Sequence, residues 1–414
     1  MSALSVSVVV VSHCRAELLP RCLTGIGQVC HPAKEIVVVA DPDGVAAVRR
    51  MGWQERVKII PFDLANISAA RNAGIAASAG EIVAFIDDDA VPEPSWLDHL
   101  TAPFADPLVA ATGGYVLGRN GISFQWRARA VNARAEKIAL DHDGDAPWEP
   151  APPKGFATKT EGTNAAFRRD VLANLGGFDP AFRFYLDETD VNLRLAATGG
   201  RTILVPLALV HHGYASSPRR AADRTPRDLH EVGASTAVFL RKHAPEVDLD
   251  GARQQLRATR RRGLVPYLID GGLEPRDFRR LLTGLDAGFA EGRLRKIAPL
   301  PPISAPSIPL RLFAPGRKPA ASRLVAGRFW QRARLRAQAQ AAVADGDLVT
   351  MLRFSPTALP HRVIFHEGGW WEQIGGLFGP SERQEPAVRV RRFSARVQKE
   401  WARVAKLRQC GADW

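Results

Sequence analysis

The amino-terminal part of the chain alternates between two hydrophobic periods. Short β-branched runs of strand length occur at residues 5–11, 35–40, 57–60 and 82–86. The stretches between them carry apolar residues at helical spacing, over residues 16–29, 44–51 and 67–79. Continuous apolar strands separated by helices predict a mostly parallel, Rossmann-like α/β sheet with helices on both faces. Ligands of such sheets bind beyond the carboxyl ends of the strands, so the residues that follow each strand are candidates for a site.

A second block of elements continues this domain over residues 162–210. Its sequence predicts a helix after Arg168, a turn at GGFDP (residues 176–180), a helix over 187–198 and a strand over 201–205. A helical stretch at 225–243 closes the block. We therefore expect one domain over residues 1–245.

The rest of the chain has a different texture. Residues 246–298 predict a basic helical segment, and residues 299–320 predict a linker because seven prolines fall between positions 299 and 319. Residues 321–414 predict a basic, mainly helical C-terminal region in which residues 351–380 are irregular.

The composition is that of a soluble globular protein, with 414 residues of which 46% are hydrophobic and 24% charged. No apolar run approaches the roughly 18 residues that span a bilayer. Residues 1–15 lack the basic start and the cleavage site of a signal peptide. We expect a cytoplasmic protein whose four cysteines, none in a C-x-x-C pair, are reduced thiols.

The net charge of +13 is unevenly distributed. Residues 1–216 carry 20 Lys and Arg against 24 Asp and Glu, a balance of −4, whereas residues 217–414 carry 36 against 19, a balance of +17. The basic half predicts an anionic partner, for which membrane surface, nucleic acid and anionic glycan are the three classes.

Three consecutive carboxylates follow the fourth predicted strand: Asp87, Asp88 and Asp89 in IDDDAVPEPSWL. Like charges this close repel unless a cation or protons intervene. Hard oxygen ligands suit Mn²⁺ or Mg²⁺, and a diphosphate can complete the coordination. The alternative is a solvated acidic turn, or the start of a helix near Ser95.

Two further clusters carry chemistry. Asp187 and Glu188 begin a predicted helix in FYLDETDVNLRL, where one carboxylate could act as a general base; ordinary first-turn acids are the alternative. His211 and His212 are candidate ligands for metal or phosphate, with a core or surface role as the alternative. Adjacent residues of a strand face opposite ways, so we expect at most one of these histidines to contact the site.

The order of these motifs resembles the family 2 glycosyltransferases of the GT-A fold. The resemblance covers residues 5–217, about half of the chain, and is carried by VSVVVVSHCRAELLPRCL, EIVVVADPD, ISAARNAGIAASAGEIVAFIDDDAVPEPSWL, EGTNAAFRR, GGFDPAFRFYLDETDVNLRL and HHGYASS. Each motif alone is only moderately specific. The resemblance depends on all six occurring in the family's order and spacing. One departure is His13-Cys14, which stands where the family has a Tyr-Asn pair. The other is a glutamate at the position of the base, where aspartate is common.

The resemblance implies a role for each matching residue. The nucleotide-sugar would be bound by Ser12, His13, Asp41, Arg71, Asp87 and Asp88. Asp89 is the best metal ligand, with Asp87, His211 and His212 as further candidates. Glu188 aligns with the base and Asp187 is its neighbour, while Trp126 and Asn164 lie where family members bind acceptors. A core role is the alternative for Trp126.

The implied reaction is inverting transfer of a sugar from a nucleotide-sugar to a hydroxyl of a glycan or lipid-linked acceptor, as in surface polysaccharide or glycolipid synthesis. A sugar nucleotidyltransferase is one alternative, but SHCRAELL (residues 12–19) lacks the expected glycine-rich loop. A non-catalytic nucleic-acid or glycan binder that uses the basic half is another. With the transferase, no nucleic acid is expected, and the oligomeric state stays open.

The tail predicts an amphipathic helix over residues 387–408. Its apolar stripe consists of Val388, Phe393, Val397, Trp401, Val404 and Leu407, and its polar face is strongly basic. Such a helix is typical of a membrane interface, which predicts peripheral attachment to the inner face of a membrane. The alternative is that the stripe packs on the protein itself.

Overall fold

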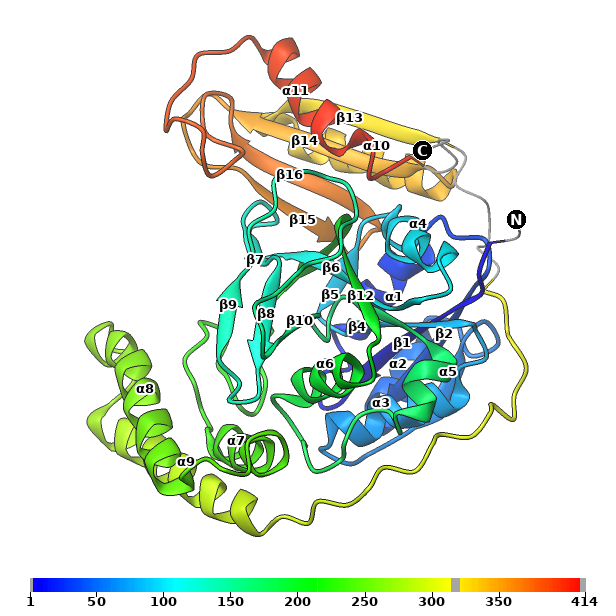
Figure 1. Cartoon of the computed structure of the whole chain (residues 1–414). Helices are drawn as coiled ribbons and strands as arrows, with labels where there is room; N and C mark the ends of the chain where they lie inside the picture. Colours follow the sequence, from blue (N-terminus) through cyan, green and yellow to red (C-terminus); the bar gives the residue numbers. More distant parts are fainter. Residues whose placement is uncertain (1–2, 214, 314–320, 410–414) are drawn as a thin grey trace.

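The computed structural model describes residues 3–213, 215–313 and 321–409, and its largest element is a nine-stranded sheet (Figure 1). The strand order is β3-β2-β1-β4-β11-β6-β12-β5, with β7 paired to β6. Its strands are β1 (Val6–Ser12), β2 (Lys34–Ala40), β3 (Lys58–Pro61), β4 (Ile82–Asp87), β5 (Ala90–Pro92), β6 (Val109–Leu117), β7 (Phe124–Trp126), β11 (Ala165–Arg168) and β12 (Arg201–His212). Strands β3, β2, β1 and β4 are parallel, and β11 is antiparallel to both β4 and β6.

Alternate valines of β1 serve two layers. Val8 and Val10 point into one hydrophobic cluster, and Val9 points into the other. The first cluster is covered by α1 (Leu19–Gly27), α2 (Pro42–Arg50) and α4 (Trp96–Thr101). The second is covered by α3 (Ile67–Ala77), α5 (Arg169–Asn174) and α6 (Asp187–Ala197). The expected mostly parallel sheet with helices on both faces is thus confirmed.

A small antiparallel sheet of order β10-β8-β9 lies beside the large one. It consists of β8 (Arg129–Asn132), β9 (Lys137–Ala139) and β10 (Phe156–Lys159). The element β10 delivers Lys159 toward the start of α6, which matters for the site.

The helices α7 (His230–His243), α8 (Leu249–Ile269) and α9 (Pro275–Leu294) form the next layer. Helices α7 and α9 touch through glycines: a Cβ on Gly288 would lie 1.9 Å from the carbonyl oxygen of His230, and one on Gly233 would lie 2.1 Å from that of Leu285. No side chain larger than hydrogen fits at these crossings.

The proline-rich stretch runs back along the N-terminal α/β domain without regular structure up to residue 313 (Figure 1). Ile303 packs against the α3–α5 layer, and Phe313 is buried beside Trp53, with 5.0 Å between ring centroids. The amide of Phe313 also donates to the carbonyl of Lys34 at 2.7 Å. This stretch is therefore attached along its length by side chains that enter the core.

The C-terminal region contains a four-stranded sheet, so the expectation that residues 351–380 are irregular is wrong. Its order is β13-β14-β16-β15, made of β13 (Ser322–Arg328), β14 (Leu348–Ser355), β16 (Trp370–Gly376) and β15 (Arg362–His366). Buried Met351, Phe354 and Trp371 supply its core contacts. The expected helices are also present, as α10 (Arg332–Ala344) and α11 (Phe393–Ala405). These strands are held by pairing with one another and with β13: β14 pairs with β13 and β16, and β15 pairs with β16.

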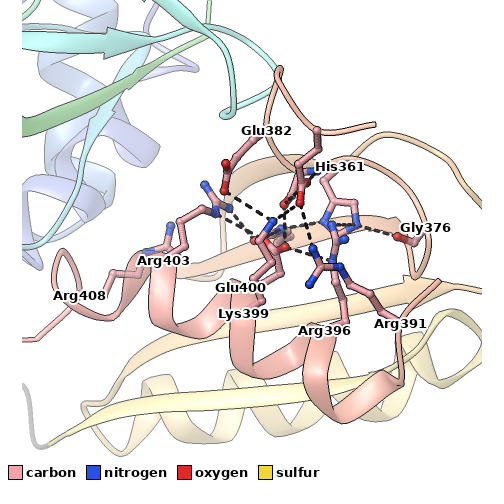
Figure 2. Close-up of polar contacts among 12 residues, drawn as sticks. His361, Gly376, Glu382, Arg391, Arg396, Lys399, Glu400, Arg403 and Arg408 are labelled. Atoms are coloured by element: carbon pink, nitrogen blue, oxygen red, sulfur yellow. Dashed lines mark hydrogen bonds and ion pairs between the residues drawn. The ribbon is translucent and has the colours of Figure 1, made fainter. Parts of the chain in front are cut away.

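The tail helix is shorter than expected, and most of its stripe is covered by the protein. Residues 387–392 are not helical, and Val388 is 60% exposed. Phe393 and Val397 pack on the C-terminal sheet, and Val404 and Leu407 are buried. The same face buries Arg396 and Glu400, joined by an ion pair of 3.1 Å (Figure 2). The alternative of self-packing therefore holds for Phe393, Val397, Val404 and Leu407, which are not free to enter a membrane, whereas Val388 lies before the helix and is exposed.

Two further expectations concern the whole chain. Within the described residues no helix is both long and apolar enough to cross a bilayer. Cys14 and Cys22 are free thiols as expected, but Cys30 is disulfide-bonded, so the expectation of reduced thiols is wrong there. Cys410 lies outside the described residues.

Candidate functional site

The three aspartates after β4 face different surroundings. Asp87 has a side chain that is 28% exposed and lines a cavity of about 510 Å³. Asp88 is fully buried and forms an ion pair with Arg15, with 2.5 Å between Asp88 Oδ1 and Arg15 Nη2. Asp89 is also buried and accepts a hydrogen bond of 2.8 Å from the amide of Ala215. The triplet is therefore a shaped site rather than a solvated turn.

Asp87, Asp89 and His212 offer a set of metal ligands. One donor atom from each lies within 4.8 Å of the others. His212 directs Nε2 to Asp89 Oδ1 at 3.2 Å, while its Nδ1 lies 3.0 Å from Gln125 Oε1. A metal-binding histidine commonly donates its second ring nitrogen in this way, so these residues fit a divalent cation. The two carboxylates of this set suit Mn²⁺ or Mg²⁺.

His211 faces away from this set, so the expectation that it binds metal is wrong. It contacts Glu93, with 2.9 Å between Nε2 and Oε1, and its ring lies 4.5 Å from that of Trp371. Residues 211 and 212 alternate on β12, and the C-terminal sheet occupies the face that His211 points to.

The buried aspartates differ in their pKa values. Burial raises the pKa of Asp88 to about 7, since Arg15 offsets only part of the desolvation. Burial acts in the same direction on Asp89, but His212 and Arg15 outweigh it and hold the pKa of that carboxyl well below its usual range. Asp89 thus stays ionised.

The cavity lies at the carboxyl ends of the first strands and contains three of the residues expected at the nucleotide. Ser12 and His13 line it together with Asp87. Asp41 instead caps α2, accepting from the amide of Gly44 at 2.8 Å and from that of Cys14 at 2.6 Å. Its two oxygens therefore already hold the chain at the edge of the cavity.

Arg71 links the two acidic clusters. Its guanidinium bonds Asp187, lies 3.5 Å from Asp87 Oδ1, and donates to the carbonyl of Gly162 at 3.2 Å. The buried Arg71 thus joins the start of α6 to the metal-ligand set and leaves Asp187 little freedom.

Glu188 has a different partner, the fully buried Lys159. Lys159 Nζ lies 2.9 Å from Glu188 Oε1 and 3.1 Å from Glu161 Oε2. Burial favours the neutral acid, but Lys159 prevails and holds the pKa of Glu188 well below its usual range. The Glu188 side chain is 21% exposed, against 5% for Asp187. Of the two acids, Glu188 is the one that a substrate can reach.

The backbone before α6 is strained. Tyr185 and Leu186 have φ values of 73° and 66°, in the left-handed region that non-glycine residues seldom adopt. Such conformations persist where the surroundings enforce them and concentrate at functional sites. Here they precede the two acids of α6.

The two expected acceptor residues have different outcomes. Trp126 lies beside the metal-ligand set, 5.6 Å from the ring of His212. Asn164 is fully buried, and its amide bonds Trp96 Nε1 and the carbonyls of Tyr115 and Ala208. The expectation that Asn164 contacts the acceptor is therefore wrong, because its hydrogen bonds hold the sheet together.

Several site residues had no signal in the sequence. Arg15 pairs with Asp88 across the end of β1, and Lys159 lies in a stretch (FATKT) that has no motif. Arg183, Arg219 and Arg260 line the cavity from segments far apart in the chain. The one sequence signal for Arg15 is its own position, three residues after Ser12 at the end of β1.

The geometry and the family agree. The chain belongs to the glycosyltransferase-like family 2, whose family model matches residues 3–230, more than half of the chain. Its α/β sheet is the GT-A fold implied by the motifs. Residues 3–230 therefore form a domain of this family.

Individual relatives resemble parts of the chain. The pre-mycofactocin glycosyltransferase of Mycobacterium tuberculosis is 30% identical over 190 residues, which are 45% of this chain and 38% of that protein. The O-antigen biosynthesis protein RfbC of Myxococcus xanthus is 27% identical over 243 residues, 53% of this chain and 18% of that protein. The chain thus spans less than half the length of these relatives.

One solved structure is similar over a larger share. It is the mannosyltransferase PcManGT from Pyrobaculum calidifontis in complex with GDP-Man and Mn²⁺, with a TM-score of 0.43 and 19% identity. The match covers 72% of this chain and 89% of that one.

Proposed function

We propose that this protein transfers a sugar, with inversion at the anomeric carbon, from a nucleotide-sugar donor to a hydroxyl of a glycan or lipid-linked acceptor. The observation that carries the proposal is the arrangement around Arg71, which joins the metal-ligand set to the acids of α6 at the edge of the cavity. Donor and acceptor chemistry would meet at this point.

Asp87, Asp89 and His212 would hold Mn²⁺ or Mg²⁺. The ion would supply charge neutralisation to the departing nucleoside diphosphate. Ser12 and His13 would contact the nucleotide in the cavity, and Asp41 would position the neighbouring backbone. Trp126, beside His212, offers a flat apolar surface for a sugar ring.

Glu188 is the proposed base, because it is ionised and accessible. It would accept the proton of the acceptor hydroxyl as that oxygen bonds the anomeric carbon and the bond to the diphosphate breaks. Lys159 keeps Glu188 charged and oriented, and Asp187 holds Arg71.

The biological setting is also a proposal. One relative is a pre-mycofactocin glycosyltransferase and another an O-antigen biosynthesis protein, and these names support a role in surface glycan or glycoconjugate synthesis.

The test has two stages. UDP-, GDP- and dTDP-sugars are first screened by thermal shift with Mn²⁺ or Mg²⁺, and with chelator as the control. The stabilising donor is then incubated with the protein, and free nucleoside diphosphate is measured for wild type and Glu188→Gln.

We expect metal-dependent release by wild type that falls about 10²–10⁴-fold in the variant. Failure of every donor to release nucleoside diphosphate would sink the proposal. Release of pyrophosphate from a nucleoside triphosphate and a sugar phosphate would instead identify a nucleotidyltransferase.

A further inference from the structure

The loops at one edge of the C-terminal sheet expose an unusual set of residues. Strands β13, β14 and β16 are parallel, so their carboxyl ends at Arg328, Ser355 and Gly376 lie along the same edge. The residues that follow these ends include large apolar side chains with high exposure: Phe329 (45%), Trp330 (65%), Leu359 (62%), Val388 (60%) and Val390 (86%). We call this set, with its neighbouring arginines, the carboxyl-edge surface.

Direct contacts connect the members of this surface. Arg328, which precedes Phe329, stacks on Phe393 at 4.3 Å. The amide of Arg389, between the two valines, donates to the carbonyl of Phe378 at 2.8 Å. The amide of Gly376 donates to the carbonyl of Leu359 at 2.9 Å. The three loops therefore adjoin one another.

The surface is also strongly basic. Five exposed arginines lie on it and have no carboxylate partner among the residues that the structure describes: Arg332, Arg362, Arg383, Arg389 and Arg392. The acids of the same loops are already neutralised, since Glu385 bonds Lys399 and Arg391, and Glu382 lies 3.7 Å from Lys399 (Figure 2). The net charge that faces solvent is therefore positive.

A buried polar network holds these loops in place. Glu400 accepts hydrogen bonds from Ser381 Oγ at 2.7 Å and from Gln373 Nε2 at 2.8 Å, and Arg396 Nη2 lies 2.9 Å from His361 Nε2 (Figure 2). Through these bonds α11 anchors the loops that carry Leu359, Val388 and Val390. The surface is thus preformed, which lowers the cost of binding.

We propose that the carboxyl-edge surface docks on the interface of an anionic lipid bilayer. Exposed aromatic and aliphatic side chains beside unpaired arginines match the two layers of such an interface, acyl chains below and anionic headgroups above. The docking itself does not depend on the proposed function. Only its purpose does: docking would hold the active site near a lipid-linked acceptor.

Two other occupants fit less well. A second copy of the chain would bring the same arginines against one another across a symmetric contact. An acidic glycan would engage the arginines and Trp330, but it would leave the leucine and the two valines without partners, because sugar rings stack on flat aromatic surfaces.

The test is sedimentation with vesicles of phosphatidylcholine and phosphatidylglycerol in equal parts. One variant, Arg362→Gln/Arg389→Gln/Arg392→Gln, removes charge, and a second, Phe329→Ala/Trp330→Ala, removes apolar area. The matched controls are Arg261→Gln/Arg262→Gln/Arg279→Gln on α8 and α9, and Leu108→Ala, which removes a side chain that is 69% exposed on the glycosyltransferase domain.

We expect wild type to sediment at low salt and to be released by high salt. The charge variant should bind about 10²-fold more weakly, at about fivefold per arginine, and the apolar variant about tenfold more weakly. Both controls should bind like wild type, and nucleoside diphosphate release should be unchanged in all variants, so this test is separate from that of the proposed function.

Three results would overturn the proposal. Wild type could stay in the supernatant at low salt, or the control on α8 and α9 could lose as much binding as the charge variant. Retention on immobilised polygalacturonate without sedimentation on vesicles would assign the surface to an acidic glycan.

Discussion

Arg408 ties the C-terminal sheet to the glycosyltransferase domain through a buried ion pair. Its guanidinium bonds both oxygens of Glu93 at 2.8 Å, and it also donates to Thr350 Oγ1 at 3.0 Å. The side chains of Arg408 and Glu93 are each 2% exposed. We predict that Arg408→Met lowers the free energy of unfolding by about 3–5 kcal/mol at pH 7, because Glu93 is left buried without its cation.

The pKa of Glu93 gives a second measure of the same interaction. Burial acts to raise it, but Arg408 and His211 lower it from 4.5 to about 2. A shift of this size is worth on the order of 3 kcal/mol, in line with the first figure. A depressed carboxylate pKa stabilises the fold above pH 4.5, and this stabilisation is lost as the pH falls through about 2.

The assay is urea unfolding of wild type and variant between pH 7 and pH 3. The difference in free energy of unfolding between wild type and Arg408→Met should shrink as the pH falls, because Glu93 in the variant protonates and no longer carries an uncompensated charge. Arg201→Met, which breaks a surface pair with a 36% exposed arginine, is the control and should cost about 1 kcal/mol or less. A loss below 1 kcal/mol at pH 7, or one that does not change with pH, would refute the reasoning.

Three further predictions follow from the site and from the α7–α9 crossing. Asp89→Ala should abolish Mn²⁺-dependent donor binding with the fold intact; calorimetry that finds unchanged metal-dependent affinity would contradict its role. Glu188→Gln should bind donor but lose transfer by about 10²–10⁴-fold, whereas an active Glu188→Gln together with an inactive Asp187→Asn would show that Asp187 is the base. Gly288→Ala should lower the free energy of unfolding by about 3 kcal/mol, because its Cβ would lie 1.9 Å from a backbone oxygen; an unchanged urea midpoint would disprove the close contact.

The local hydrophobic pattern of the sequence was enough to predict the core of the N-terminal α/β domain. Uninterrupted valines over β1 and β2 can only be buried on both faces, and such strands need helices on either side. The position of the Asp87–Asp89 triplet after β4 followed from this topology, since the carboxyl ends of parallel strands share one edge.

Pairing between distant residues was not encoded in any local pattern. Alternation on β12 separates His211 from His212, but only the packing of Trp371 on one face shows which of them meets the aspartates. Asn164 lies within a motif of the family, yet its amide is used up by the sheet.

The family, the α/β sheet and the identity of the acidic clusters could be predicted from the sequence, because they depend on hydrophobic period and on residues close in the chain. The tertiary structure alone decided the partners: Lys159 for Glu188, Arg15 for Asp88, and the C-terminal sheet for the apolar stripe of α11. A buried charge or an amphipathic face is satisfied by whatever element packs against it, and the separation along the chain ranges from 29 residues for Lys159 and Glu188 to 315 for Arg408 and Glu93.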